Sequence, residues 1–212
     1  MRFFHAVLVM AIALLTIATT AASTPDHSNR RMLRAIDTNL DERASLIMWA
    51  KVRSWARAGK SDAYVKEKLG IAGLRGGVLK SNPNYKHLQK FRYKLEGYTL
   101  DDWMEEGLTV HGAWMHLKLN EVPEAALAQS DKFRTYKRYA TRWDDMTYAH
   151  YNTIFQPPVE YGGSPAELNA KVEIWAAARR PKWYVQDMLN LDKSDELLSY
   201  YNKFVELKYP KK

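Results

Sequence analysis

The chain of 212 residues contains no cysteine. This absence excludes a disulfide framework, a cysteine nucleophile and any zinc site built on thiolates. The folded state must therefore be held by its hydrophobic core alone. Such a chain also loses nothing when it enters a reducing cytosol, which fits a protein that leaves one cell and works inside another.

Catalytic motifs are also missing. No H-E-x-x-H or G-x-S-x-G pattern occurs, and His111 and His116 are five residues apart, a poor spacing for a metal pair on a helix. The glycine-rich stretch 70–77 lacks both a preceding strand and a Walker Lys-Ser/Thr, so it indicates a loop between helices. The acidic pairs around Trp103 (Asp101-Asp102 and Glu105-Glu106) are typical of a solvated helix face. We expect no enzyme, no metal and no cofactor.

Long apolar runs are absent after the N-terminus. The run from about Ala6 to Ala18 follows one arginine and is followed by small residues, which indicates a secretory signal peptide over 1–23, cleaved after Ser23. A retained anchor is the alternative, but the run is short for a bilayer of roughly 30 Å. Cleavage removes Arg2 from 32 basic residues and leaves 31 against 24 acidic ones, a net charge of +7. Because the two signs are interleaved, we expect no single large basic face.

Strand-type alternation is rare, so the sequence predicts an all-α protein. Residues 24–44 are polar and charged with few apolar anchors, which predicts disorder. From Ala44 onward, aromatic and leucine residues fall at helical spacing.

The folded part repeats itself. A shift of 48 residues superposes a set of large apolar residues and one glycine: Trp55/Trp103, Gly59/Gly107, Leu69/Leu117, Ile71/Leu119, Leu79/Leu127, Tyr85/Phe133, Leu88/Tyr136, Phe91/Tyr139 and Leu95/Trp143. A third, shortened copy starts at Trp175, with Leu189 and Leu191 in register and with Leu198, Tyr201 and Phe204 in place of Phe133, Tyr136 and Tyr139. A repeat of this length predicts small helical units that stack on one another.

Each unit is predicted to contain about three helices. The tryptophan lies near the end of the first, and the second starts six residues later, where Ser61 and Thr109 are N-cap residues and Pro181 suits the first helical position. The third helix carries the aromatic set; Pro83 starts it in the first copy and Ser130 caps it in the second. The predicted units span 45–98, 99–156 and 166–212, with a Pro/Gly linker over 157–165.

The segments before the folded part resemble those of a known family. Arg31-Met32-Leu33-Arg34 has the form R-x-L-R after a signal peptide, and Asp41-Glu42-Arg43 resembles the acidic dEER element that follows it. With the repeat, the chain resembles the RXLR effectors of oomycete plant pathogens, whose WY modules match Trp55, Phe91, Trp103, Tyr139, Trp175 and Phe204. Phe replaces the usual Tyr in copies one and three.

The resemblance implies a function. It implies secretion, passage into plant host cells through the 24–44 segment, and a virulence role in the host nucleus or cytoplasm. There the protein would bind host proteins and suppress immunity or defence-associated cell death. A helical protein that acts outside cells, and a basic nuclear effector that contacts nucleic acid, remain alternatives. The expected partners are host proteins, without a small-molecule substrate, nucleic acid or membrane span in the mature chain.

The copies differ most in two places, and there we expect the partner to bind. The insert over about 141–169 carries Phe155 and Tyr161, and the basic-aromatic segment carries Arg179, Arg180, Lys182 and Trp183. Aromatic residues and arginine are enriched at binding hot spots. Alternatively, the rings of the insert fill the space between units, and the basic segment is solvated surface, a nuclear import signal or a phosphate contact. Phe204 and Leu207 of "FVEL" have the spacing of an autophagy-adaptor ligand, but both are also expected in the core.

Overall fold

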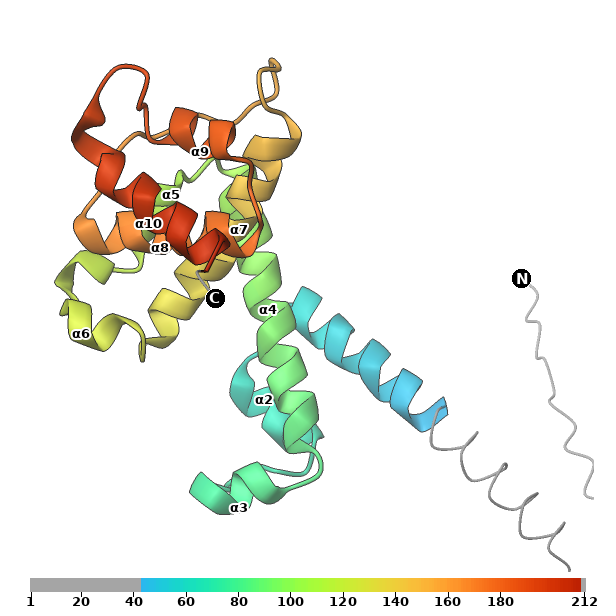
Figure 1. Cartoon of the computed structure of the whole chain (residues 1–212). Coiled ribbons are helices and arrows are strands. Elements are labelled where there is room, and N and C mark those ends of the chain that lie inside the picture. Colours follow the sequence, from blue (N-terminus) through green and yellow to red (C-terminus); the bar gives the residue numbers. More distant parts are fainter. Residues whose placement is uncertain (1–42, 211–212) are drawn as a thin grey trace, which may run out of the picture. The chain divides into compact units, whose positions relative to one another are not determined.

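The computed structural model describes residues 43–210, and this part of the chain is helical without a strand (Figure 1). A first helix covers 43–57. The later helices are α2 (Asp62–Lys68), α3 (Gly76–Ser81), α4 (Tyr85–Glu105), α5 (Val110–His116), α6 (Glu124–Leu127), α7 (Asp131–Ala149), α8 (Pro165–Ala177), α9 (Lys182–Met188) and α10 (Leu198–Lys208), with short 3₁₀ turns at Leu119–Glu121 and Asp195–Leu197. The all-α prediction is confirmed.

The N-terminal predictions lie mostly outside the described residues. This applies to the signal peptide over 1–23, to Arg31–Arg34, and to Asp41 and Glu42. The predicted disordered segment ends too late, because Arg43 and Ala44 already belong to the first helix. The residues that follow, Leu46, Ile47 and Met48 among them, are compatible with a helix and allow it to start before residue 45.

One helix end recurs three times at the spacing of the sequence repeat. Four residues after each tryptophan, the backbone takes the left-handed conformation, with φ values of 59°, 71° and 54° at Gly59, Gly107 and Arg179. The next amide bonds to the tryptophan carbonyl at 3.0, 2.9 and 2.9 Å for Trp55, Trp103 and Trp175. This six-to-one bond closes a helix in the Schellman manner. In the third copy Arg179, one of the predicted partner-binding residues, holds the place of a glycine.

The second helix of each copy starts where the sequence predicts. The hydroxyls of Ser61 and Thr109 accept bonds from the amides of Tyr64 and Gly112 at 3.2 and 3.1 Å, and so cap α2 and α5. Pro181 precedes α9 as its N-cap and does not occupy the first helical position. A second left-handed residue follows each of these helices, at Gly70, Lys118 and Asn190.

The third helix departs from the prediction in detail. Pro83 lies in the turn before α4, and Ser130 precedes α7 without a capping bond from its side chain. The predicted boundary between 98 and 99 falls inside α4, which is continuous from Tyr85 to Glu105. Division of the chain into WY-type units stacked in an array stays a prediction.

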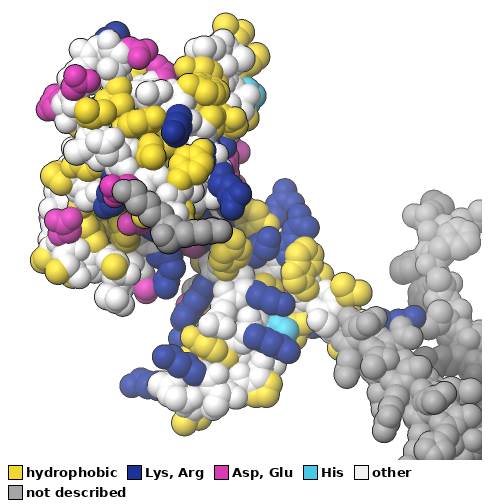
Figure 2. Space-filling view, viewed as in Figure 1, with side chains coloured by type: hydrophobic (Ala, Val, Ile, Leu, Met, Phe, Trp, Pro, Cys, Tyr) yellow, Lys and Arg dark blue, Asp and Glu magenta, His cyan; other side chains and the backbone are white. Residues whose placement is uncertain are grey.

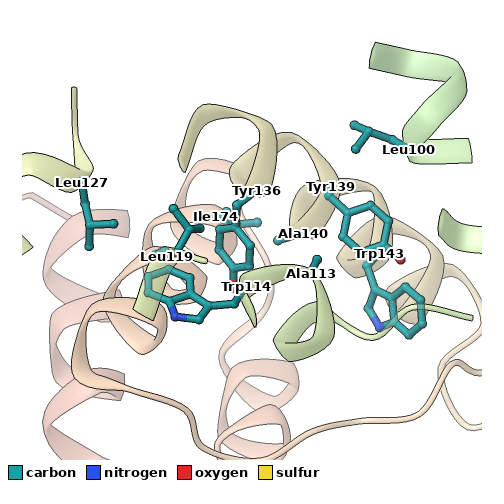
Figure 3. Close-up of a cluster of buried hydrophobic side chains, with 11 residues drawn as sticks. Leu100, Ala113, Trp114, Leu119, Leu127, Tyr136, Tyr139, Ala140, Trp143 and Ile174 are labelled. Atoms are coloured by element: carbon teal, nitrogen blue, oxygen red, sulfur yellow. The ribbon is translucent and has the colours of Figure 1, made fainter. Parts of the chain in front are cut away.

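Two buried clusters fill the part from α4 to α10. In the first, Trp114 packs edge-on against Tyr136 at 5.0 Å between ring centroids, and Tyr139 lies beside Trp143 at 6.0 Å (Figure 3). The second gathers Trp175, Tyr184 and Phe204 where α8 packs against α10. Burying each large apolar side chain contributes roughly 1.5–3 kcal/mol to the stability of the fold. These clusters can therefore stabilise a chain that has no disulfides.

The predicted aromatic core positions are not equally buried. Phe91, Tyr139 and Phe204 are fully buried and Trp175 is nearly so, whereas Trp55 and Trp103 are half-buried. Trp114, which the repeat does not single out, is buried instead.

Candidate partner-binding surface

A buried carboxylate organises the region that the sequence singles out for partner binding. Asp144 of α7 accepts hydrogen bonds from Trp175 Nε1 at 2.9 Å, from Arg180 Nε at 2.7 Å and from the Tyr184 hydroxyl at 2.8 Å. These donors come from α8, from the turn after it and from α9. One side chain therefore fixes the three elements that carry the basic-aromatic segment.

The charges of this network compensate each other. Burial raises the pKa of Asp144, and the hydrogen bonds from Arg180, Tyr184 and Trp175 act against that rise. Burial lowers the pKa of Arg180, but Asp144 and Asp145 outweigh it and leave the pKa raised. An ionised pair in such a place needs these extra hydrogen bonds to offset its lost hydration. We infer a structural role for the network.

The prediction that Arg180 is available to a partner is therefore wrong. Its side chain is only 9% exposed, and its guanidinium bonds to Asp144 and Asp145. The sequence could not reveal this, because Asp144 lies 36 residues earlier in the chain.

Trp183 is part of an exposed aromatic surface next to this network, because its neighbour Tyr184 bonds to Asp144. Half of Trp183 is exposed. Its indole packs against the Tyr151 and Tyr148 rings, with 5.0 and 6.3 Å between the ring centroids. The Arg180 guanidinium lies 4.4 Å from the centre of the Tyr148 ring on the side of the buried network. The Tyr151 hydroxyl donates to Asp187 Oδ2 at 2.9 Å. These contacts hold the rings in place while they face solvent.

The loop after α7 extends this surface. Ile154 is 93% exposed and Phe155 is 70% exposed. The loop is ordered by its own hydrogen bonds, from the Asn152 amide to the Gln156 side chain at 2.6 Å and from the Thr153 hydroxyl to the His150 carbonyl at 2.7 Å. Figure 2 shows hydrophobic side chains gathered on this projecting loop. We call Tyr148, Tyr151, Ile154, Phe155 and Trp183 the aromatic surface.

The remaining predicted residues lie at other positions. Tyr161 is exposed but lines a separate hollow with Leu168 and Leu189. Lys182 is exposed, and its ammonium lies 5.3 Å from the Tyr209 ring. In the "FVEL" stretch Phe204 is buried, as expected, but Leu207 is exposed, contrary to expectation. A buried Phe204 cannot serve as the anchor of an adaptor ligand.

The two histidines considered for a metal pair each contact another side chain. His111 Nδ1 lies 2.9 Å from Glu167 Oε2, and His116 packs against Trp103. Within 43–210, no group of three His, Cys, Asp or Glu side chains lies close enough to hold a metal ion. No helix in the same range is long and apolar enough to cross a membrane. The absence of enzymatic activity stays a prediction.

Comparison with known proteins identifies the relatives of the chain. It is 29% identical to a "Secreted RxLR effector protein" of Phytophthora infestans over 98% of the chain and 96% of that relative. It is 27% identical to "RxLR effector protein Avr1" of the same organism, over 82% of the chain and 89% of Avr1. "RxLR effector protein Avh241" of Phytophthora sojae is 26% identical over 45% of the chain and 52% of Avh241. No protein-family model and no solved structure matches the chain.

The similarity of the chain to secreted effector proteins, over nearly its whole length in one case, supports a secreted virulence effector. The similarity to these three proteins supports the resemblance to the RXLR effectors of oomycetes that the Arg31-Met32-Leu33-Arg34 motif indicates.

Proposed function

We propose that the protein acts inside plant host cells, in the nucleus or the cytoplasm, by binding host proteins through the aromatic surface. Binding suppresses immunity or defence-associated cell death. The protein has no catalytic role in this proposal. The observation that carries it is the contrast between the exposed Phe155 and Trp183 and the buried network that fixes their supports.

Exposed aromatic side chains of this kind favour a protein partner. Large aromatic residues supply much contact area and lose little conformational freedom on binding, so they dominate binding hot spots. Trp183 is already packed against Tyr151, and Tyr151 is hydrogen-bonded to Asp187. A surface ordered before binding loses less entropy when the partner arrives.

The test uses single and double alanine variants of Phe155 and Trp183, with Tyr161→Ala as a third variant. Each is compared with Met115→Ala, which removes a similarly exposed apolar side chain from α5. Thermal unfolding and suppression of an immune response in plant tissue are measured for all of them. We expect Phe155→Ala and Trp183→Ala to lose suppression and keep their fold, whereas Met115→Ala keeps both.

Two other outcomes decide against the proposal. If suppression and folding are lost together, the rings belong to the core. If the double variant suppresses as well as the unchanged protein, the aromatic surface does not bind the partner. Activity only when the protein is kept outside plant cells would favour the alternative of an extracellular helical protein.

A further inference from the structure

The charges of the chain are segregated along it. Residues 49–97 hold twelve Lys and Arg against three acidic residues, a net charge of +9, whereas residues 98–210 hold thirteen against seventeen, a net charge of −4. Figure 2 shows Lys and Arg side chains gathered over α2, α3 and the start of α4. We expect no single large basic face because the two signs are interleaved over the whole chain, but within 49–97 the basic residues clearly outnumber the acidic ones.

A hollow lies on this basic region between the first helix and α4. Lys86, Lys90 and Lys94 line one side of it. They recur every fourth residue, so they stand on one face of α4, about 6 Å apart along the helix axis. The buried Val52 contributes to its lining, together with the exposed rings of Trp49 and Tyr93. The hollow thus combines an apolar lining with a row of cations.

Nothing in the described fold accounts for the lysine row. Other cations nearby have acidic partners: Arg92 bonds to Asp62, and Arg138 bonds to Glu96. None of the three lysines forms an ion pair with a carboxylate in the part of the chain that the structure describes. Like charges at this spacing destabilise a helix. Repulsion within the lysine row therefore destabilises α4 in the free protein, and an anionic partner would relieve that repulsion.

We propose that this hollow binds an acidic amphipathic helix of a host protein. The inference rests on the proposed function and adds the chemistry of a partner to it. Carboxylates four residues apart on a helix have the same spacing of about 6 Å as the lysine row, and an apolar side chain beside them fits against Val52. A helix laid in a groove between two helices is a common mode of recognition.

The aromatic rings favour a protein over a nucleic acid. One face of Tyr93 is covered by the Arg138 guanidinium at 3.7 Å from the ring centre, and Arg53 lies 5.6 Å from the Trp49 ring. Proteins that bind single strands offer open ring faces on which successive bases stack. Here the rings act as walls for an apolar side chain.

The test measures binding of defined probes to the mature chain, residues 24–212. The probes are a blocked helical peptide with Glu at every fourth position and Leu beside it, a scrambled peptide of the same composition, and an oligothymidylate. We expect the helical peptide to bind, and to bind more tightly than the other two probes. Changing Lys86, Lys90 and Lys94 together to Glu should weaken binding by about tenfold or more.

The matched control reverses three exposed lysines outside the basic region, Lys118, Lys132 and Lys193, and so changes the net charge equally. It should leave peptide binding within about twofold of the unchanged protein, because rim and distant charges act only through screened fields. Equal losses in both variants, equal binding of the scrambled peptide, or tighter binding of the oligothymidylate would overturn the proposal.

A single change separates binding from folding. Lys90→Glu places an acid between Lys86 and Lys94, so α4 gains two attractive pairs and the unfolding temperature should stay or rise while peptide binding falls. A loss of binding seen only in variants that unfold would count against the hollow. In plant tissue, a folded Lys90→Glu variant that still suppresses fully removes the hollow from the function and leaves the proposed function standing. Failure of the unchanged protein to suppress refutes the proposed function instead.

Discussion

The Trp103 indole meets the Tyr139 ring edge-on, with 5.5 Å between the ring centroids and 78° between the ring planes. Trp103 lies in the last turn of α4 and Tyr139 in the middle of α7, so the pair joins two helices that are separated in sequence. The Tyr139 hydroxyl also donates to the Leu108 carbonyl, in the turn that follows Trp103. The same tyrosine thus contacts the tryptophan and the end of its helix.

Trp103→Ala should lower the free energy of unfolding by about 3 kcal/mol, as large aromatic deletions do in cores. We expect the low end of the usual range because the indole is half-buried. Chemical denaturation of the two proteins measures the difference. Trp183→Ala deletes the same side chain from an exposed position and should cost less. An unchanged stability of Trp103→Ala would show that the Trp103–Tyr139 contact is not part of the core.

Tyr139→Phe should cost about 1 kcal/mol, because it leaves the Leu108 carbonyl without its donor. Burial raises the pKa of Tyr139 to about 12, so the hydroxyl keeps its proton and stays a donor at neutral pH. The reverse change, Phe204→Tyr, adds a hydroxyl to a fully buried ring and should also destabilise. Equal stability of Tyr139→Phe and the unchanged protein in urea would rule out a stabilising role for this bond.

The pair of Asp62 and Arg92 should make stability depend on pH. The hydrogen bond from Arg92 lowers the pKa of Asp62 from its ordinary 3.8 to about 2. Since the folded pKa is the lower one, the stabilisation is present above pH 3.8 and is lost as pH falls toward about 2. Arg92→Gln should raise the pKa of Asp62 and flatten this part of the profile.

Carboxyl chemical shifts of Asp62 followed through an acid titration check this expectation. Arg134→Gln, which removes an exposed ion pair with Asp131 at the start of α7, is the matched control and should leave the Asp62 titration unchanged. A titration of Asp62 that is the same with and without Arg92 would contradict the assignment.

Changing Arg31, Leu33 and Arg34 together to Ala should alter processing or uptake when the pathogen secretes the protein. These residues precede the described helices, so thermal unfolding of the variant should match that of the unchanged chain. Both properties can be measured on the same preparation and in infected tissue. Normal processing and uptake of the variant would refute the delivery role of the motif.

Local features of the fold could be predicted from the sequence. Helix starts at Ser61 and Thr109 follow from capping, which depends on residues three positions apart. The burial of Phe91, Tyr139 and Phe204 follows from a helical repeat of large apolar residues. Each of these signals is contained in a short window, so no knowledge of the tertiary structure is needed.

Features that depend on distant partners could not be predicted. The burial of Arg180 requires Asp144, and nothing in the sequence pairs one acid of the adjacent Asp144-Asp145 with a residue in the turn after the next helix. The lysine row of α4 was visible in the sequence as Lys86, Lys90 and Lys94, but its relation to Trp49 appears only when the first helix packs beside α4. Counting charge by segment instead of over the whole chain would have indicated it.

The most direct test of the central claim is a quantitative affinity purification from plant tissue. The mature chain is compared with the Phe155→Ala/Trp183→Ala double variant, at equal expression and with equal unfolding temperatures. We predict that at least one host protein co-purifies with the unchanged chain, is lost with the double variant, and binds the purified unchanged chain but not the variant. Recovery of the same host proteins by both chains would contradict the claim that the aromatic surface binds the host partner.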